Sequence, residues 1–238
     1  MTITPHFVFV HLPKTGGTFV SRHCWRIWGD QCIDYPTYPK HAKRREIPAE
    51  YRHLPVVGTI RSPYDWFVSA YHFPWWRDHA ESFPGLQSLP TYPDVSFDQF
   101  VRLATARWWA RQHPELGRKP QLGHAAYCWV AWLGKEPFGF LRAALDAPPT
   151  PDAFREQLAG ARLLRTSRLN QDLAELLAGC GVMQSEIDAV LESTRVQPGD
   201  AAHHRRQRDW RPFYSPKLKA FVRESERVFF DAFPEFDE

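Results

Sequence analysis

The sequence contains few cysteines and no long hydrophobic run. Its four cysteines are widely spaced and include no Cys-x-x-Cys pair, which is typical of reduced, buried thiols in a reducing compartment. No window approaches the roughly 18 apolar residues that a membrane span needs. The first residues lack a basic stretch followed by an apolar core and a cleavage site. We therefore expect a soluble, cytoplasmic protein without a membrane span.

The sequence also carries little net charge. It has 30 Lys and Arg against 27 Asp and Glu, which gives a formal charge of +3. Proteins that bind nucleic acids usually concentrate far more positive charge, so we expect no nucleic-acid partner. A small basic surplus is better suited to one local anionic ligand.

The residues that are present suit a globular fold. A chain of 238 residues, 43% of them hydrophobic, is long enough to bury a core, and we expect a single domain over 1–238. Aromatic residues are abundant, with 10 Trp, 17 Phe and 8 Tyr. Trp and Pro gather at about 73–125, which we interpret as an insert whose first part, 73–95, forms an ordered loop or lid.

The first motif joins a strand to a helix through a glycine loop. Residues 6–12, HFVFVHL, are short, β-branched and aromatic, as in a central strand. Helical periodicity begins near Gly17, after Lys14-Thr15-Gly16. Backbone N–H groups at a helix N-terminus bind anions, and glycines let an anion approach closely. Lys14 adds a charge and the Thr15 and Thr18 hydroxyls add donors, so the loop is a candidate phosphate cradle.

A second unit of the same kind follows. Residues 55–60, PVVGTI, predict a strand that ends at Arg61, and Ser62-Pro63 then predicts the start of a helix. Ser69 lies on that helix. An arginine fork with a nearby hydroxyl can hold a second phosphate. Alternating strands and helices indicate an α/β sheet whose ligands bind at the carboxyl ends of the strands.

The rest of the sequence gives a coarser pattern. It predicts helices at 96–113, 124–135, 169–179 and 184–193, a strand at 162–166, a hinge at 147–152, a loop at 195–211 and a final helix from Pro216.

The glycine loop is not the Walker pattern. GxxxxGK[ST] places its lysine after the glycines, whereas Lys14 precedes them. A glycine turn with an incidental lysine remains open for this loop taken alone. A surface ion pair for Arg61 and an ordinary helical position for Ser69 remain open as well. Two candidate anion sites at the ends of strands in one sheet favour the functional interpretation.

These two motifs resemble those of sulfotransferases that use 3′-phosphoadenosine 5′-phosphosulfate (PAPS). FVHLPKTGGTFV (9–20) resembles the phosphosulfate loop of the carbohydrate-type enzymes, with its HxPKTGGT pattern. VVGTIRSPYDWFVSAY (56–71) resembles their 3′-phosphate motif, RxPxxxxxSxY. RTSRLNQDLAELL (165–177) and the ending PFYSPKLKAFVRESERVFFDAF resemble later family segments more loosely, and 73–160 matches only vaguely.

The resemblance implies a fold and a reaction. The fold is a three-layer P-loop-kinase-like core, with a short parallel sheet flanked by helices. The reaction is transfer of a sulfuryl group from PAPS to an acceptor hydroxyl, on a glycan or a glycan-bearing small molecule, without a metal. The product is adenosine 3′,5′-bisphosphate. The alternatives are an ATP-dependent kinase of the P-loop type, or a catalytically silent nucleotide- or glycan-binding module.

The resemblance also implies roles for individual residues. Lys14 is expected to stabilise charge on the bridging oxygen of the leaving phosphate. Four neighbours in the loop are expected to hold the 5′-phosphosulfate: Thr15, Gly16, Gly17 and Thr18. Arg61 and Ser69 are expected to hold the 3′-phosphate. His41 is expected to be the general base, with His11 or Glu46 as alternatives.

Overall fold

The computed structural model describes residues 1–34, 37, 39–73, 75–79, 84–103, 113–194 and 209–237. Their contacts divide the chain into two compact units. Unit 1 comprises Met1–Arg61, Ala131–Lys135 and Leu158–Arg206, and unit 2 comprises Ser62–Val130, Glu136–Gln157 and Gln207–Glu238. The expectation of one domain over the whole chain stays a prediction.

Unit 1 is built around a small mixed sheet. Its strands, in spatial order, are β1 (Thr2–Ile3), β2 (Val8–Phe9), β3 (Val56–Ile60) and β4 (Ala161–Arg165). β2, β3 and β4 are parallel, as the alternation of strands and helices predicts. β1 pairs antiparallel with β2, so the expectation of a purely parallel sheet is wrong. The α/β class is confirmed.

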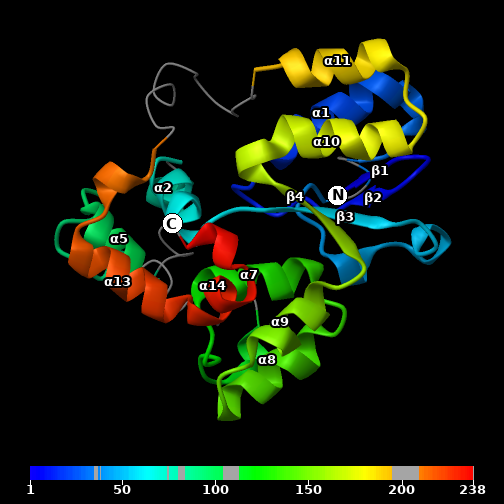
Figure 1. Cartoon of the computed structure of the whole chain (residues 1–238). Helices are drawn as coiled ribbons and strands as arrows, with labels where there is room; N and C mark the ends of the chain where they lie inside the picture. Colours follow the sequence, from blue (N-terminus) through cyan, green and yellow to red (C-terminus); the bar gives the residue numbers. More distant parts are fainter. Residues whose placement is uncertain are drawn as a thin grey trace. The chain divides into compact units, whose positions relative to one another are not determined.

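Three helices pack on one face of this sheet. They are α1 (Gly17–Trp28), α10 (Leu169–Gly179) and α11 (Gln184–Glu192), which Figure 1 shows side by side with the strands beneath them. The core they share contains Phe9 and Val57 from the sheet, Val20 from α1 and Leu173 from α10. The helical periodicity after Gly17 is therefore confirmed as α1, with Phe19, Val20 and Cys24 buried in this core.

The opposite face of β3 meets the end of α7 (His124–Leu133). Successive residues of a strand point to opposite faces, so Gly58 follows Val57 on the other side. A Cβ atom at Gly58 would lie 2.7 Å from two methyl carbons of Leu133. The missing side chain is what allows this close approach.

Short 3-10 helices complete unit 1. They are η1 (Gly29–Gln31), η2 (Arg44–Glu46), η3 (Ala49–Tyr51) and η6 (Thr166–Arg168). The basic run at 40–46 thus includes one such turn, η2. It is anchored by Arg44, whose guanidinium donates hydrogen bonds to the carbonyl oxygens of Leu133 at 3.1 Å and Ala159 at 3.3 Å.

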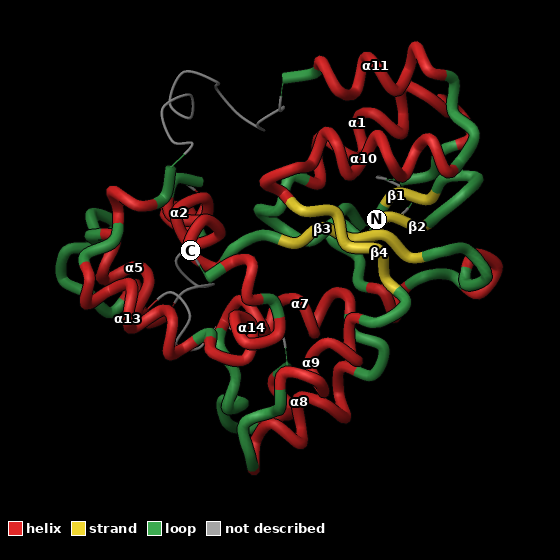
Figure 2. Tube along the Cα trace, viewed as in Figure 1, coloured by secondary structure: helices red, strands yellow, loops and turns green. Residues whose placement is uncertain are grey.

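Unit 2 is helical, as the tube in Figure 2 shows. Its helices are α2 (Pro63–Tyr71), α3 (Trp75–Asp78), α4 (Pro84–Gln87), α5 (Phe97–Leu103), most of α7, α8 (Pro137–Asp146), most of α9 (Pro151–Leu158), α13 (Pro216–Ser225) and α14 (Arg227–Ala232). Short turns are η5 (Pro114–Leu116), η7 (Arg211–Phe213) and η8 (Pro234–Phe236). No helix in the described part of the chain is both long and apolar enough to cross a membrane.

Several expectations for these segments change. The proposed loop at 73–95 contains the short helices α3 and α4. The final helix is two helices that meet at Glu226, whose backbone leaves the helical conformation. The second half of the helix expected at 96–113, and most of the loop expected at 195–211, lie outside the described residues.

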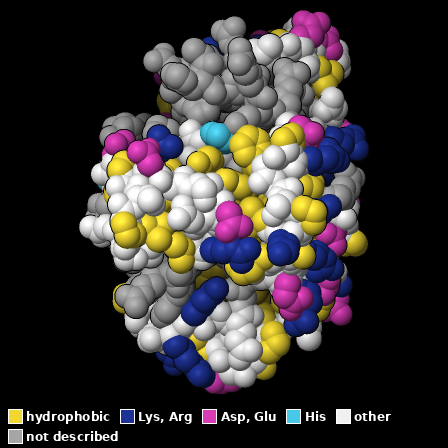
Figure 3. All heavy atoms as spheres, turned by 90° about the vertical axis from the view of Figure 1, so that its left-hand side faces the viewer, with side chains coloured by type: hydrophobic (Ala, Val, Ile, Leu, Met, Phe, Trp, Pro, Cys, Tyr) yellow, Lys and Arg dark blue, Asp and Glu magenta, His cyan; other side chains and the backbone are white. Residues whose placement is uncertain are grey.

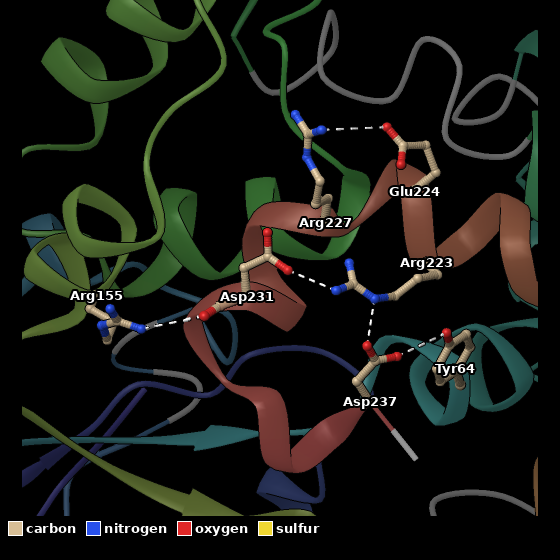
Figure 4. A network of polar contacts seen from close by, with 7 residues as sticks. All are labelled: Tyr64, Arg155, Arg223, Glu224, Arg227, Asp231 and Asp237. Carbon is tan, nitrogen blue, oxygen red and sulfur yellow. Dashed lines mark hydrogen bonds and ion pairs between the residues drawn. The ribbon is translucent and has the colours of Figure 1, made fainter.

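A network of ion pairs ties the last residues of unit 2 together (Figure 4). Arg223 on α13 lies between Asp231, at 2.7 Å, and Asp237. Asp237 also accepts a hydrogen bond from the hydroxyl of Tyr64 on α2. Ser62, the residue before that helix, donates to the carbonyl oxygen of Phe236 rather than capping the helix itself. α2 is thus bound to the end of the chain.

The surface agrees with the low net charge. On the face drawn in Figure 3, basic, acidic and hydrophobic side chains are interspersed. Charges of both signs are therefore present on that face.

Candidate functional site

The glycine loop has an unusual backbone. Lys14 has a φ of 66° and Gly16 a φ of 87°, and Gly16 is the residue that caps α1. A residue with a side chain at positive φ costs roughly 1–2 kcal/mol. Such strain gathers at functional sites. The turn brings the N–H groups of Gly17 and Thr18 to the first turn of α1, where they have no partner within the helix.

Both glycines are required by their neighbours. A Cβ atom at Gly17 would lie 2.1 Å from the ring of His11, and one at Gly16 would lie 2.6 Å from a methyl carbon of Leu169. The loop is therefore pressed against the end of β2 on one side and the start of α10 on the other. Neither position can accept a side chain without displacing a neighbour.

Three threonines hold the loop to the ends of the strands. The buried Thr15 hydroxyl donates to the carbonyl oxygen of Leu12 at 2.7 Å and contacts the hydroxyl of Thr59 on β3. Thr166, after β4, lies 3.0 Å from the carbonyl oxygens of Thr15 and Ile60. The Thr15 hydroxyl thus donates inside the protein, and its expected role as a donor to a ligand stays a prediction. Its backbone remains part of the loop.

Arg61 lies at the same edge of the sheet. It follows β3, and its guanidinium donates to the carbonyl oxygen of Lys14 at 2.8 Å. Burial lowers the pKa of Lys14 to about 8, and the charge of Arg61 acts in the same direction. Two cations thus lie close together in a partly desolvated place. An anion bound there would relieve their repulsion.

Thr18 and Lys40 lie beside each other at the start of α1. The Lys40 ammonium is 3.4 Å from the Thr18 hydroxyl. Thr18 is half-buried, whereas Lys40 is exposed. The segment around 40–41 therefore adds a positive charge to the loop, which the sequence motif did not assign.

His41 is tied to the end of β2. Its Nδ1 donates to the carbonyl oxygen of His11 at 2.9 Å, and the two rings meet edge to face with centroids 4.8 Å apart. Because a carbonyl can only accept, this bond places the proton of neutral His41 on Nδ1 and leaves Nε2 as the basic nitrogen. Burial lowers the pKa of His41, while the hydrogen bond to His11 opposes that effect.

The two alternative bases are less suited to the role. His11 is 4% exposed, and burial lowers its pKa, with His41 and Lys40 acting in the same direction. Its ring covers Gly17. A carboxylate oxygen of Glu46 accepts from the backbone N–H of Lys43 at 2.7 Å and closes the turn of η2. His41 is therefore the best placed of the three.

The segment that carries His41 is fixed from behind. The indole N–H of Trp132 donates to the carbonyl oxygen of His41 at 3.0 Å. The ammonium of Lys43, which is 9% exposed, lies 5.1 Å from the centre of the same indole ring. The end of α7 thus determines where His41 is held.

The structure brings some predicted residues together and leaves one in the other unit. The loop 14–18, Arg61 and His41 all belong to unit 1. Ser69 is half-buried on α2 in unit 2, and its part in the 3′-phosphate site stays a prediction. Thr59 and Thr166, which hold the loop in place, were not among the residues predicted from the motifs. Each lies at or just after the end of a parallel strand, and that position in the sequence could have identified both residues.

Lys14→Met should raise stability at neutral pH. The folded state lowers the pKa of Lys14 from 10.5 to about 8, so below pH 8 it holds a disfavoured charge. Each pKa unit corresponds to about 1.4 kcal/mol, and partial exposure reduces the effect to roughly 1–2 kcal/mol. Met is similar in shape to Lys, and the cost of the positive φ at this position is the same for both residues. We expect a melting temperature several degrees higher at pH 7.

The pH dependence has a definite sign. The unfolded chain binds the extra proton between pH 8 and 10.5, so the stability of the wild type rises across that window. The advantage of Lys14→Met should therefore shrink from pH 8 to pH 10. A gap that stays constant with pH would contradict the buried charge. The matched control is Lys217→Met, an exposed lysine of α13, which should change little at any pH.

Comparison with known proteins gives no information about this site. No protein-family model, no curated protein and no solved structure matches the chain. What unit 1 presents is a strained glycine loop at a helix N-terminus, with Lys14, Arg61 and His41 around it.

Proposed function

We propose that the protein is a PAPS-dependent sulfotransferase with a P-loop-kinase-like arrangement of its sheet and helices. The observation that carries the proposal is the loop itself. Lys14 and Arg61 lie together at the N-terminus of α1, on a backbone whose conformation the surrounding threonines maintain. The resemblance of 9–20 and 56–71 to the two donor-binding motifs supplies the identity of the anion.

The loop fits the phosphosulfate end of the donor. The N–H groups of Gly17 and Thr18 and the positive end of the α1 dipole favour an anion. A Cβ atom at Gly17 would overlap the His11 ring, so the absence of a side chain lets that ring pack against the loop. Burial lowers the pKa of Lys14 to about 8, and a phosphate beside the ammonium would stabilise its charged form.

Lys14 and His41 divide the chemistry. The acceptor oxygen forms a bond to sulfur while the bond from sulfur to the bridging oxygen breaks, and the electron pair leaves with the 5′-phosphate. Lys14 stabilises the negative charge that develops on that oxygen. Nε2 of His41 takes the proton from the acceptor hydroxyl. The bond from Nδ1 to His11 keeps Nε2 in its basic form and stabilises the charge that His41 then carries.

The role of Arg61 needs a test that separates two effects. Arg61 holds the carbonyl oxygen of Lys14, so its loss would disturb the loop as well as any contact with a 3′-phosphate. A comparison of adenosine 3′,5′-bisphosphate with AMP isolates the second effect, because AMP lacks the 3′-phosphate. The cycle of two ligands and two proteins gives the coupling directly.

Wild-type protein should bind adenosine 3′,5′-bisphosphate at least tenfold more tightly than AMP, with a chelator present. Arg61→Ala should abolish most of that preference, because the guanidinium is the 3′-phosphate partner. Isothermal calorimetry measures all four constants. Arg162→Ala, on an exposed position of β4, serves as the matched control.

Two results would count against the proposal. Equal weakening of both ligands in Arg61→Ala would make Arg61 a brace of the loop and no more. Tighter binding of ATP with Mg²⁺ than of adenosine 3′,5′-bisphosphate would favour the kinase instead.

His41→Gln should lose turnover and keep donor binding. Glutamine can still donate to the carbonyl oxygen of His11 but cannot accept the acceptor's proton. Loss of a general base costs about 10²–10⁴-fold in rate. The assay measures release of adenosine 3′,5′-bisphosphate from PAPS with a panel of glycans and phenols, after subtraction of release without acceptor.

The control for this variant is His53→Gln, at an exposed histidine of the same unit. Its rate should equal that of the wild type. Full turnover in His41→Gln would remove His41 from the mechanism. Binding that continues without transfer in the wild type, to every acceptor in the panel, would favour a silent binding module.

A further inference from the structure

Unit 2 contains a cavity of its own. Its volume is about 230 Å³, and it lies among α2, α5, α13 and the turn before α7. Two aromatic rings, Phe67 and Phe221, and two valines, Val101 and Val222, form apolar walls. A cavity of about 150 Å³ is enough for benzene. This one therefore has room for a single aromatic ring with two substituents.

Two basic side chains line the same cavity. Arg102 on α5 and Lys119 are both exposed. The guanidinium of Arg102 lies 4.3 Å from the centre of the Phe221 ring and 2.8 Å from Asp98, one turn earlier on α5. An exposed pair of this kind contributes only about 0.3–0.5 kcal/mol. A ligand carboxylate can therefore compete with Asp98 for Arg102.

Away from the two cations, the lining contains the carboxylate of Glu226, which already has hydrogen-bond partners. Glu226 is 1% exposed, and its carboxylate accepts from the N–H groups of Ala125 at 2.9 Å and Ala126 at 3.1 Å. It thus occupies the N-terminus of α7 in the way an anionic ligand would. Its oxygens retain further acceptor capacity, so a ligand hydroxyl can donate to them.

The protonation states of Glu226 and His124 also favour a ligand that carries a carboxylate. Burial raises the pKa of Glu226 to about 7, against the opposing hydrogen bonds from α7. Burial lowers the pKa of His124 to about 3, with Lys119 acting in the same direction, so the imidazole is neutral. With the two exposed cations, the lining as a whole is positive at neutral pH.

We propose that this cavity binds a small aromatic monoanion: a single ring with a carboxylate toward Arg102 and Lys119 and a hydroxyl toward Glu226. The ring packs against Phe67 and Phe221. Arylalkylamines, which carry an ammonium at neutral pH, are disfavoured because their charge would meet Arg102 and Lys119. The site shares no residue with the loop of unit 1, so it stands independently of the proposed sulfotransfer.

The test uses 4-hydroxybenzoate as the probe, with two analogues of the same size. 4-Hydroxybenzyl alcohol replaces the carboxylate with a neutral group, and tyramine replaces it with a cation. Calorimetry on the full chain should give at least tenfold tighter binding for 4-hydroxybenzoate than for either analogue. Lys119→Gln should weaken it about threefold, and Arg102→Gln with Lys119→Gln at least tenfold.

Two controls locate the binding. Lys217→Gln removes an exposed charge elsewhere in unit 2, and Lys40→Gln removes one beside the loop of unit 1; neither should change the affinity. Lys119 is exposed, so Lys119→Gln should fold normally. Its affinity for 4-hydroxybenzoate therefore tests the proposal even if the double variant unfolds. Equal binding of charged and neutral probes, no binding of any probe, or a loss confined to Lys40→Gln would each overturn the proposal.

Discussion

The hydroxyl of Thr166 is the contact on which the candidate site depends. Bonding to the carbonyl oxygens of Thr15 and Ile60, it joins the ends of two strands to the glycine loop. The Thr15 hydroxyl, held between Leu12 and Thr59, completes the attachment. Buried hydroxyls with satisfied partners hold a backbone rigidly. They offset the cost of the positive φ at Lys14 and fix the backbone at the start of α1.

The end of β2 serves both halves of the proposed chemistry. The ring of His11 covers Gly17 and so shapes the anion loop. The carbonyl oxygen of the same residue receives the Nδ1 proton of His41 and sets which nitrogen of the base is free to act. His11 would thus perform no chemical step itself. It would position both the loop that holds the leaving group and the base that acts on the acceptor. Its lowered pKa fits this role, because it stays neutral beside Lys40 and His41.

The sequence predicted the parts of the molecule whose cause is local. The strands before Lys14 and Arg61, α1, α7 and α10 all follow from periodicity and from glycine or proline at their ends. Contacts between residues far apart in the chain could not be predicted from the sequence. β1 has two residues and therefore no measurable period. The helix breaks at Glu226, whose carboxylate accepts from the N–H group of Ala125, 101 residues away. α8 and α9 were missed beside the proline-rich 147–152.

The pKa of Lys14, with and without adenosine 3′,5′-bisphosphate, tests the account most directly. It can be followed by NMR of the labelled lysine side chain, assigned by comparison with Lys14→Met. The free protein should titrate near pH 8. Bound nucleotide should raise the pKa by at least one unit, because a phosphate beside the ammonium favours its charged form. An unchanged pKa at saturating nucleotide would contradict the claim that this loop holds the donor.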